Sequence, residues 1–241
     1  MKSVSLFKAS AIALLFVSEA ALAAGMVPET SVVIVEQRDG EGSINVKNTD
    51  NSPLLLLTEL EDIKEDKDQL LIVTPPTARV EAGKSQRVRF IMADKTPLKT
   101  ERLKRVTFEG VPPQQKGKNV VRVNVRQNLP VLIRPAGLEA DSAPWKRLIW
   151  KKVGDKLTVN NPSPYVVRMG QGVHTLADNN LWSLPNAYIL PGESHTLTVS
   201  GKAKADAKIE KPKDGNLNVV RISPATTWGF TVNSYDAPLS Q

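Results

Sequence analysis

Few side chains in this 241-residue chain are of the types that carry out enzymatic chemistry. The sequence has no cysteine and only two histidines, His174 and His195. This excludes disulfides and thiolate chemistry, and it leaves too few histidines for most metal or proton-relay sites. The sequence also lacks the G-x-S-x-G, P-loop and H-E-x-x-H motifs, and the charged stretch from Glu59 to Asp68 is predicted to be a solvated loop between strands. We therefore expect neither an enzyme nor a bound cofactor or metal.

One segment has a pattern suited to backbone pairing with another protein. Valines alternate with polar residues in VRVNVR, residues 121–126. In an extended strand this places Val121, Val123 and Val125 on one face and the polar side chains on the other. Periodicity alone favours an ordinary sandwich strand with its valines in the domain core. The alternative is an exposed edge strand that extends the sheet of a partner.

The elements that must position this segment are predicted to be short strands. Hydrophobic residues recur with a period of two, and turn-forming pairs such as Asp39-Gly40 and Gly154-Asp155 separate the runs. The expected strands lie at residues 31–35, 43–46, 54–57, 86–90, 120–125 and 157–159. Many short strands in a chain of this length predict an all-β protein of two sandwich domains. The best boundary is the Pro/Gly hinge at Arg134–Gly137, which gives domains at residues 24–136 and 137–241.

The N-terminus has the features of a secretory signal peptide. Lys2 and Lys8 precede an apolar run, Ala11–Val17, and Ala21–Ala23 forms a small-x-small cleavage site. The apolar run is much shorter than the ~20 residues of a membrane span, which disfavours the alternative of an anchor helix. We expect cleavage after Ala23 and an exported mature protein that is not inserted in a membrane. Its net charge of +7 is a weak indication of acidic or carboxylate-bearing partners.

Four ordered motifs run along the mature chain. They are Thr74-Pro75-Pro76 with residues 79–83 and 86–89; Thr100-Glu101-Arg102 followed by Val111-Pro112-Pro113; Val131-Leu132-Ile133-Arg134-Pro135; and Asn161-Pro162-Ser163-Pro164-Tyr165. Their order and spacing resemble those of the PapD-like periplasmic pilus chaperones. The second motif departs from the family pattern, because Lys104, Arg105 and Thr107 occupy positions where two aromatic residues and an asparagine are usual.

The resemblance implies a boomerang of two immunoglobulin-like domains that binds pilus (fimbrial) subunits in the periplasm. Such a chaperone binds, folds and caps a subunit that lacks its last strand, by donor-strand complementation, and delivers it to an outer-membrane usher. By position before the domain junction, the donor strand would be Val121–Leu129, with Val121, Val123 and Val125 filling the subunit's groove.

The resemblance also implies a basic pair that holds the subunit's terminal carboxylate. In this chain Ser31 and Pro130 occupy the two family positions, and neither can donate a charged hydrogen bond. Basic residues nearby in the sequence are Arg126, Arg122 and Arg38. Arg126 is the preferred substitute because a guanidinium can bind a carboxylate through two hydrogen bonds. Two alternatives stay open: Arg126 is a solvated surface residue, or the subunit is held mainly by strand pairing.

An interdomain ionic cluster is a further implication of the resemblance. Glu101 and Arg134 occupy two of its positions and are expected to orient the domains without contacting the subunit. Ser234 stands where the family has a third, acidic member, and Asp236 is a candidate replacement.

A structural or adhesive immunoglobulin-like subunit of a surface fibre is the alternative function. Such a subunit needs an N-terminal donor extension, for which residues 24–30 are too short, and an open second sandwich, whereas residues 228–232 form a credible closing strand. Export and the lack of aromatic residues among the basic stretches argue against nucleic acid as a partner. Whether the free protein caps its own donor strand by dimerising is left open.

Overall fold

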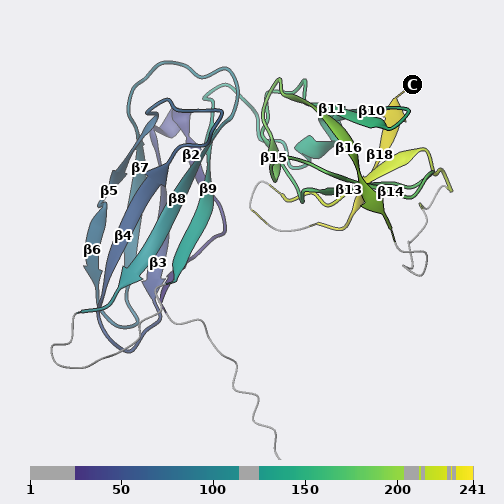
Figure 1. Ribbon diagram of the computed structural model, residues 1–241. Helices are drawn as coiled ribbons and strands as arrows, with labels where there is room; N and C mark the ends of the chain where they lie inside the picture. The colour runs from purple at the N-terminus through teal and green to yellow at the C-terminus, as the bar shows by residue number, and fades with distance from the viewer. Residues whose placement is uncertain are drawn as a thin grey trace, which may run out of the picture.

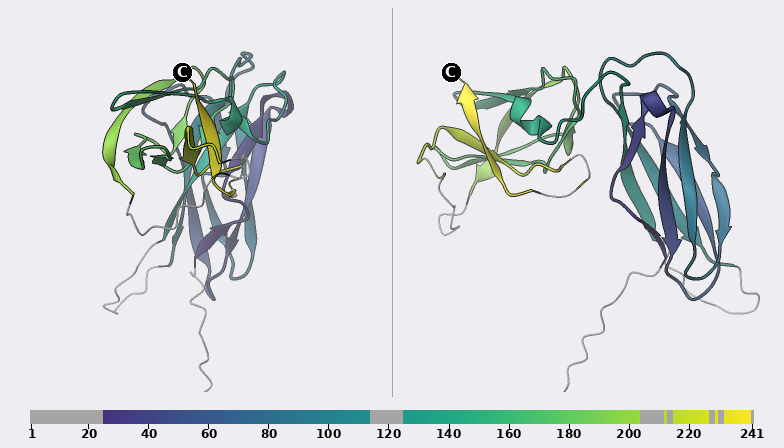
Figure 2. Two further views of the ribbon diagram at one scale, coloured as in Figure 1. Left: turned by 90° about the vertical axis from the view of Figure 1, so that its right-hand side faces the viewer. Right: turned by 180° about the vertical axis from the view of Figure 1, so that it is seen from behind.

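The computed structural model describes residues 25–113, 125–203, 212, 215–226, 229 and 232–240 of the chain. The predicted signal peptide, residues 1–23, lies outside these ranges, as do Val121, Arg122 and Val123. The described residues form two lobes built almost entirely of strands, which lie side by side (Figure 1). The lobes are joined near one end of the first lobe, whose other end extends away from the second lobe (Figure 2). The prediction of two β-sandwich domains is confirmed.

In the first lobe, the described residues form nine strands and one short 3-10 helix, η1 (Gln37–Asp39). The strands are β1 (Met26–Pro28), β2 (Val33–Glu36), β3 (Glu41–Asn48), β4 (Leu54–Glu61), β5 (Leu71–Thr74), β6 (Thr77–Val80), β7 (Ser85–Met92), β8 (Arg102–Val111) and β9 (Arg126–Arg134). They are hydrogen-bonded in the order β5-β7-β3-β2-β9-β8-β4-β6, and β1 pairs with β3. Strand β2 therefore connects the layer that contains β3 with the layer that contains β9.

Alternation along these strands builds the core of the first lobe, as the period of two predicts. The side chains that four strands contribute to this core are Ile44 and Val46 on β3, Val88 and Phe90 on β7, Val106 and Phe108 on β8, and Leu129, Val131 and Ile133 on β9. The intervening side chains of β3 and β7, including Asn45, Arg87 and Arg89, are exposed. Strands β3 and β7 thus present one face to the core and one to solvent.

The second lobe is a closed sandwich. Its elements are η2 (Pro144–Arg147), β10 (Ile149–Val153), β11 (Lys156–Asn160), β12 (Val167–Arg168), β13 (Gly172–Thr175), β14 (Asn180–Ser183), β15 (Tyr188–Ile189), β16 (Ser194–Lys202), β17 (Val219–Ile222) and β18 (Tyr235–Ser240). Seven of them close in the order β10-β11-β16-β14-β13-β17-β18 around Trp150 and Trp182. Strand β18 closes the ring by pairing with both β17 and β10. Of the segment 228–232 that we predicted for this role, Trp228, Phe230 and Thr231 lie outside the described residues; β18 begins after it, at Tyr235.

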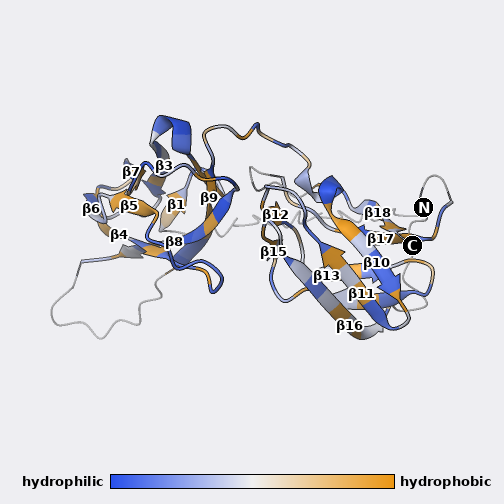
Figure 3. Ribbon diagram, turned by 90° about the horizontal axis from the view of Figure 1, so that it is seen from above, coloured by the Kyte–Doolittle hydropathy of each residue, from blue (hydrophilic) through white to orange (hydrophobic). Residues whose placement is uncertain are grey.

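A third apolar cluster joins the two lobes. It contains Val32, Leu103 and Leu132 from the first lobe and Val166 from the second, all buried. Viewed from above, β9 lies on the side of the first lobe that faces the second, and β12 and β15 lie on the side of the second lobe that faces the first (Figure 3). The predicted boundary at residues 136 and 137 lies between the end of β9 and the start of η2. In the described parts of the chain, no helix is long and apolar enough to cross a bilayer.

Candidate functional site: the free edge of β9

Strand β9 is paired from Arg126 to Ile133 on one edge and over a much shorter stretch on the other. On one edge it pairs with β8, from Arg126 opposite Glu109 to Ile133 opposite Arg102. On the other edge it pairs with β2, in parallel, only from Val131 to Arg134. Among the described strands, none pairs with this second edge between Arg126 and Pro130. An unpaired stretch of backbone at a sheet edge is a template on which another chain can add a strand.

A groove runs along this free edge. It has a volume of about 610 Å³ and is lined by two segments, Val27–Ser31 on one side and Gln127–Leu129 on the other. The first segment separates from β9 because β1 pairs with β3, while β2 pairs with β9 only from Val33 onward. The groove therefore forms where the N-terminal segment changes its pairing partner from β3 to β9. Its walls include the apolar residue Val27, which is 38% exposed.

The side chains of β9 alternate across the sheet. Leu129, Val131 and Ile133 are buried in the core of the first lobe, whereas Arg126 and Asn128 are exposed on the opposite face. Val125 directly precedes the strand, is 42% exposed and falls on the same alternation as Leu129. The apolar side chains on this face of β9 are therefore buried toward the end of the strand at Arg134, and the same row becomes exposed at Val125. Of the predicted donor strand Val121–Leu129, the structure describes Val125–Leu129; Val121 and Val123 lie outside the described residues.

The residues considered for a carboxylate anchor are not equivalent in the structure. Ser31 lines the groove, and Pro130 is buried opposite Arg105 on β8. Arg126 already has partners, because its Nη2 donates to Oε2 of Glu59 at 2.8 Å and to Oε1 of Glu61 at 3.0 Å. A guanidinium that binds two carboxylates has less to gain from a third, which argues against Arg126 as the anchor. Arg122 lies outside the described residues.

Glu101 and Arg134 meet at the junction of the lobes. The Nε of Arg134 lies 3.4 Å from Oε1 of Glu101, and its Nη1 is hydrogen-bonded to Glu36. Oε2 of Glu101 accepts a hydrogen bond of 2.9 Å from the backbone N–H of Val166 in the second lobe. Burial raises the pKa of Glu101, and the hydrogen bond from Val166 and the charge of Arg134 oppose that rise.

The third member of this cluster is not the residue that we expected. Asp236 instead binds Arg221 within the second lobe, with Oδ1 2.6 Å from Nε and Oδ2 2.7 Å from Nη2. The prediction for Asp236 is therefore wrong, because β18 pairs with β17 and places Asp236 opposite Arg221. Glu36 takes the acidic position because β2 pairs it with Arg134 across the parallel ladder.

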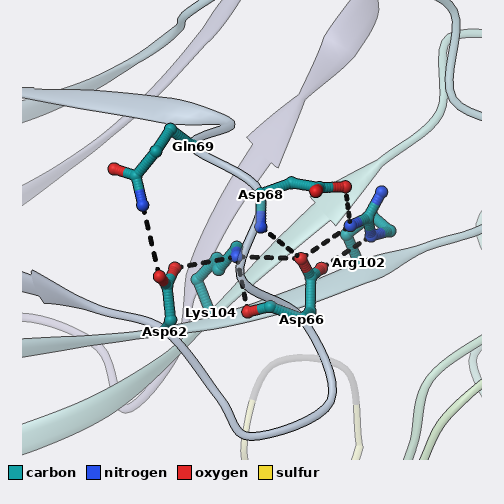
Figure 4. A network of polar contacts seen from close by, with 6 residues as sticks. All are labelled: Asp62, Asp66, Asp68, Gln69, Arg102 and Lys104. Atoms are coloured by element: carbon teal, nitrogen blue, oxygen red, sulfur yellow. Dashed lines mark hydrogen bonds and ion pairs between the residues drawn. The ribbon is translucent and has the colours of Figure 1, made fainter.

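A buried ionic network lies in the loop that the sequence predicted to be solvated. Nζ of Lys104 donates to Oδ1 of Asp62 at 2.9 Å, to Oδ1 of Asp66 at 2.9 Å and to the carbonyl oxygen of Asp66 at 2.8 Å (Figure 4). Arg102 binds the other oxygen of Asp66 and also Asp68. Asp66 is 7% exposed, so the solvated-loop prediction is wrong for this residue; its partner Lys104, on β8, is 3% exposed. The signal in the sequence was the departure of the second motif from the family pattern at Lys104.

Comparisons with known proteins agree with this geometry. A family model described as "Pili and flagellar-assembly chaperone, PapD N-terminal domain" matches residues 25–139, and "Pili assembly chaperone PapD, C-terminal domain" matches residues 143–211. The "Uncharacterized fimbrial chaperone YhcA" of Escherichia coli (strain K12) is 44% identical over 216 residues, which cover 89% of this chain and 90% of that protein. The "Chaperone protein PsaB" of Yersinia pestis is 30% identical over 204 residues, 74% of each chain.

Solved structures share the fold. A chain in the structure of the Salmonella enterica SafA pilin in complex with the SafB chaperone superposes with a TM-score of 0.68 at 19% identity, covering 91% of this chain and 99% of that one. The Escherichia coli chaperone DraB gives a TM-score of 0.67 at 20% identity, covering 89% and 98%. The chain belongs to the PapD-like family of pilus assembly chaperones, whose role is not enzymatic. Within the described residues, no group of three or more histidine or acidic side chains is arranged to hold a metal ion.

Proposed function

We propose that this protein is a periplasmic chaperone that captures pilus subunits on the free edge of β9, caps them by donor-strand complementation and delivers them to an outer-membrane usher. The observation that carries the proposal is the combination of an unpaired backbone edge from Arg126 to Pro130 with a groove of about 610 Å³ beside it. Membership of the pilus chaperone family supports it. The signal peptide predicted at residues 1–23 supports export to the periplasm.

Two kinds of contact would hold the subunit. Backbone groups on the free edge of β9 would continue the subunit's sheet, and an apolar row from Val121, Val123 and Val125 would fill the place of its missing strand. At roughly 25 cal/mol per Å², burying three valines contributes only a few kcal/mol. Backbone hydrogen bonds and the remaining groove must therefore contribute too. Capture should depend on strand register more than on any one valine, since a slip of one residue turns every side chain to the other face.

The junction of the lobes would set the angle at which a subunit is received. Glu101 contacts both Arg134 in its own lobe and the backbone of Val166 in the other, so it links the position of β9 to that of the second domain. In this proposal Glu101 and Arg134 position the domains and do not contact the subunit. A separate proposal is that a second copy of the protein covers the free edge of β9 when no subunit is bound. The mass of the free protein in solution tests this proposal.

The alternative, a structural subunit of a fibre, is disfavoured by the second lobe. A fibre subunit that accepts a donor strand needs an open sandwich, and β18 closes this one by pairing with β10 and β17. No described feature therefore favours the alternative.

Co-purification tests the proposal. The full chain is expressed with each pilin encoded near its gene, and periplasmic extracts are analysed for complexes by size-exclusion chromatography and mass. We expect 1:1 complexes, and we expect the pilins to be degraded when the chaperone is omitted. If no 1:1 complex forms and the pilins accumulate equally well without it, the chaperone function is wrong.

A further inference from the structure

Two arginines face each other across the junction of the lobes, and neither forms an ion pair among the described residues. Arg105 lies on β8, directly opposite Pro130 in the ladder with β9. Its Nε donates to Oδ1 of Asn128 at 2.7 Å and its Nη2 to the carbonyl oxygen of Asn128 at 2.9 Å. These bonds hold the guanidinium of Arg105 over β9, close to the stretch whose outer edge is free.

Arg168 approaches the same place from the second lobe. On the small sheet of β12 and β15, Val167 pairs with Ile189, and both belong to the core of the second lobe. Arg168 pairs with Tyr188, so these two side chains lie on the opposite face of the small sheet, the face toward the first lobe. Tyr188 packs against the interdomain apolar cluster, and its hydroxyl donates to Oε2 of Glu65 at 2.9 Å. Arg168 is therefore directed into the junction.

The guanidinium of Arg168 has an unused donor. Its Nη1 is buried and has no hydrogen-bond partner within the described chain. A buried donor of a charged group that lacks a partner is costly in a folded protein. Two acids near the pair are already engaged, because Glu61 accepts bonds from Arg126 and Asn128, and Glu65 from Tyr188.

The electrostatics of the pair agree with this geometry. Burial lowers the pKa of Arg168, and the positive charge of Arg105 lowers it further. Burial also lowers the pKa of Arg105, opposed by the charge of Glu61. Two desolvated like charges disfavour each other, and a carboxylate placed between them would relieve both the repulsion and the missing hydrogen bond.

The free edge of β9 leads directly to this pair. A strand added along that edge must end where β2 begins, because β2 occupies the edge from Val131 onward. The end of the added strand therefore arrives beside Pro130, whose neighbour across the ladder is Arg105. We propose that Arg105 and Arg168 together bind the C-terminal carboxylate of the subunit strand that pairs with β9, in place of Ser31 and Pro130. The proposal rests on the function proposed above, and it adds which residues of this chain form the anchor.

Subunit capture tests the two residues. Arg105→Gln and Arg168→Gln should each weaken capture of a co-expressed pilin at least about tenfold, as expected for the loss of a charge-assisted hydrogen bond. The free protein should keep or raise its melting temperature, because either change removes the repulsion between the two guanidinium groups. Arg79→Gln is the matched control, since Arg79 lies on β6 at one end of the sheet, separated from β9 by β8 and β4, is paired with Glu81 and should leave capture unchanged. Wild-type capture by the Arg105→Gln/Arg168→Gln double variant would overturn the proposal.

A subunit-free experiment separates the anchor from the chaperone function. The Nε–Hε signals of the arginines in the full mature protein are recorded by NMR while sodium acetate or acetamide is added. Acetate should shift the signals of Arg105 and Arg168 more than that of Arg126, and acetamide should not. If acetate shifts them but no pilin is captured, the anchor stands and the proposed function fails; if acetate leaves them unmoved, the anchor is wrong.

A synthetic peptide distinguishes the two sources of a carboxylate. The peptide is the C-terminal segment of a captured pilin, made once with a free C-terminal acid and once with an amide. The acid should bind at least about tenfold more tightly than the amide to the wild-type protein and equally weakly to Arg168→Gln. Equal binding of both peptides to the wild type would contradict the terminal carboxylate and assign the site to an acidic side chain.

Discussion

The carboxylate of Glu101, in the first lobe, accepts a hydrogen bond of 2.9 Å from the backbone N–H of Val166, in the second. The backbone N–H of Glu101 in turn donates to the carbonyl oxygen of Pro164 at 2.8 Å. One residue therefore makes both a donor and an acceptor contact with the loop between β11 and β12 of the second lobe. A change at Glu101 should alter how the domains are held together more than it alters either core.

The first prediction compares two substitutions of Glu101. Glu101→Ala leaves the Val166 N–H and part of Arg134 without a partner, and should lower the free energy of unfolding by about 3 kcal/mol. Glu101→Gln keeps an acceptor for Val166 and loses no more than about 1 kcal/mol. Urea unfolding followed by tryptophan fluorescence measures both. Glu81→Ala, which removes one partner of an exposed pair with Arg79, is the control and should stay within about 0.5 kcal/mol of the wild type.

The pH dependence of this comparison follows from the raised pKa of Glu101. Because burial raises that pKa, the charged form of Glu101 is disfavoured in the folded state, and the cost disappears as the pH falls through the folded-state pKa. The Glu101→Gln variant has no titrating group at this position, so the stability of the wild type relative to Glu101→Gln should rise as the pH falls through the folded-state pKa. A relative stability of the wild type that falls as the pH is lowered would contradict the raised pKa.

A second prediction concerns the buried network around Lys104. Lys104→Met leaves Asp62 and Asp66 without their shared cation and should cost on the order of 3 kcal/mol at neutral pH. Lys67→Met, a change of an exposed lysine in the same loop, should cost little. Thermal unfolding of the two variants at matched pH measures the difference. Equal melting temperatures would show that Lys104 is not needed to compensate the buried acids.

The same network predicts a loss of stability in acid. Burial alone would raise the pKa of Asp66, but the hydrogen bonds from Arg102 and Lys104 outweigh it and hold the pKa below its usual range. A lowered carboxyl pKa contributes stability above its unfolded value of about 3.9, and this contribution is lost as the pH falls through the folded-state value. The stability gap between the wild type and Lys104→Met should therefore narrow as the pH falls below about 4.

A third prediction tests the donor row. Val123→Asp and Val125→Asp each place a charge on the face that is proposed to enter the subunit, and should reduce pilin capture at least about tenfold. Neither should unfold the chaperone, since Val125 is 42% exposed. Ile72→Asp, on β5 of the same lobe and 57% exposed, is the matched control and should capture normally. Normal capture by both valine variants would refute the donor-strand assignment.

The fourth prediction concerns Gly229, which brings the second lobe against the first. Its φ of +85° lies in the left-handed region, and a Cβ at this position would overlap Oγ of Ser31 and lie 2.7 Å from Cγ2 of Val32. Gly154 also has a positive φ, +56°, but a Cβ there meets no atom within 4 Å. Gly154→Ala should cost only the backbone strain, about 1 kcal/mol.

Gly229→Ala should cost more than Gly154→Ala, because it adds the clash with the first lobe to the strain. It should also weaken pilin capture, because Ser31 lines the groove beside β9. Urea unfolding and co-purification of the two variants measure these effects. Equal stability and equal capture would show that the contact between Gly229 and Ser31 does not hold the lobes together.

Strand periodicity predicted the parts of this fold that depend on local pattern. The strand expected at residues 86–90 is the centre of β7, and the one expected at 157–159 is the centre of β11, because each alternates apolar and polar side chains over its own length. The motif at residues 161–165 also has a local basis. The side chain of Asn161 is fully buried and donates to the carbonyl oxygen of Tyr165 at 2.8 Å, which fixes the loop between β11 and β12.

Contacts between distant segments could not be predicted from the sequence in the same way. Lys104 meets Asp66 only because β4 and β8 pair in a particular register, and no local pattern reports that register. Arg105 and Arg168 come close enough for their charges to interact only because two separately folded domains dock against each other. From the sequence, Arg126 was the preferred carboxylate anchor because it lies on the predicted donor strand. In the structure, Arg126 forms ion pairs with Glu59 and Glu61 of β4.

Pro130 stands at the end of the free stretch of β9, one residue before β2 begins to occupy that edge. A proline has no N–H, so a strand added beside β9 receives no backbone donor from this residue. Two features therefore limit how far the added strand can extend along β9: Pro130 offers it no backbone N–H, and β2 occupies the edge from Val131 onward. A subunit whose last strand is one residue too long would have to slip, and the slip would turn its apolar side chains away from the groove. The chaperone would in this way measure the length of its client's C-terminal strand, and select subunits by where their chains end.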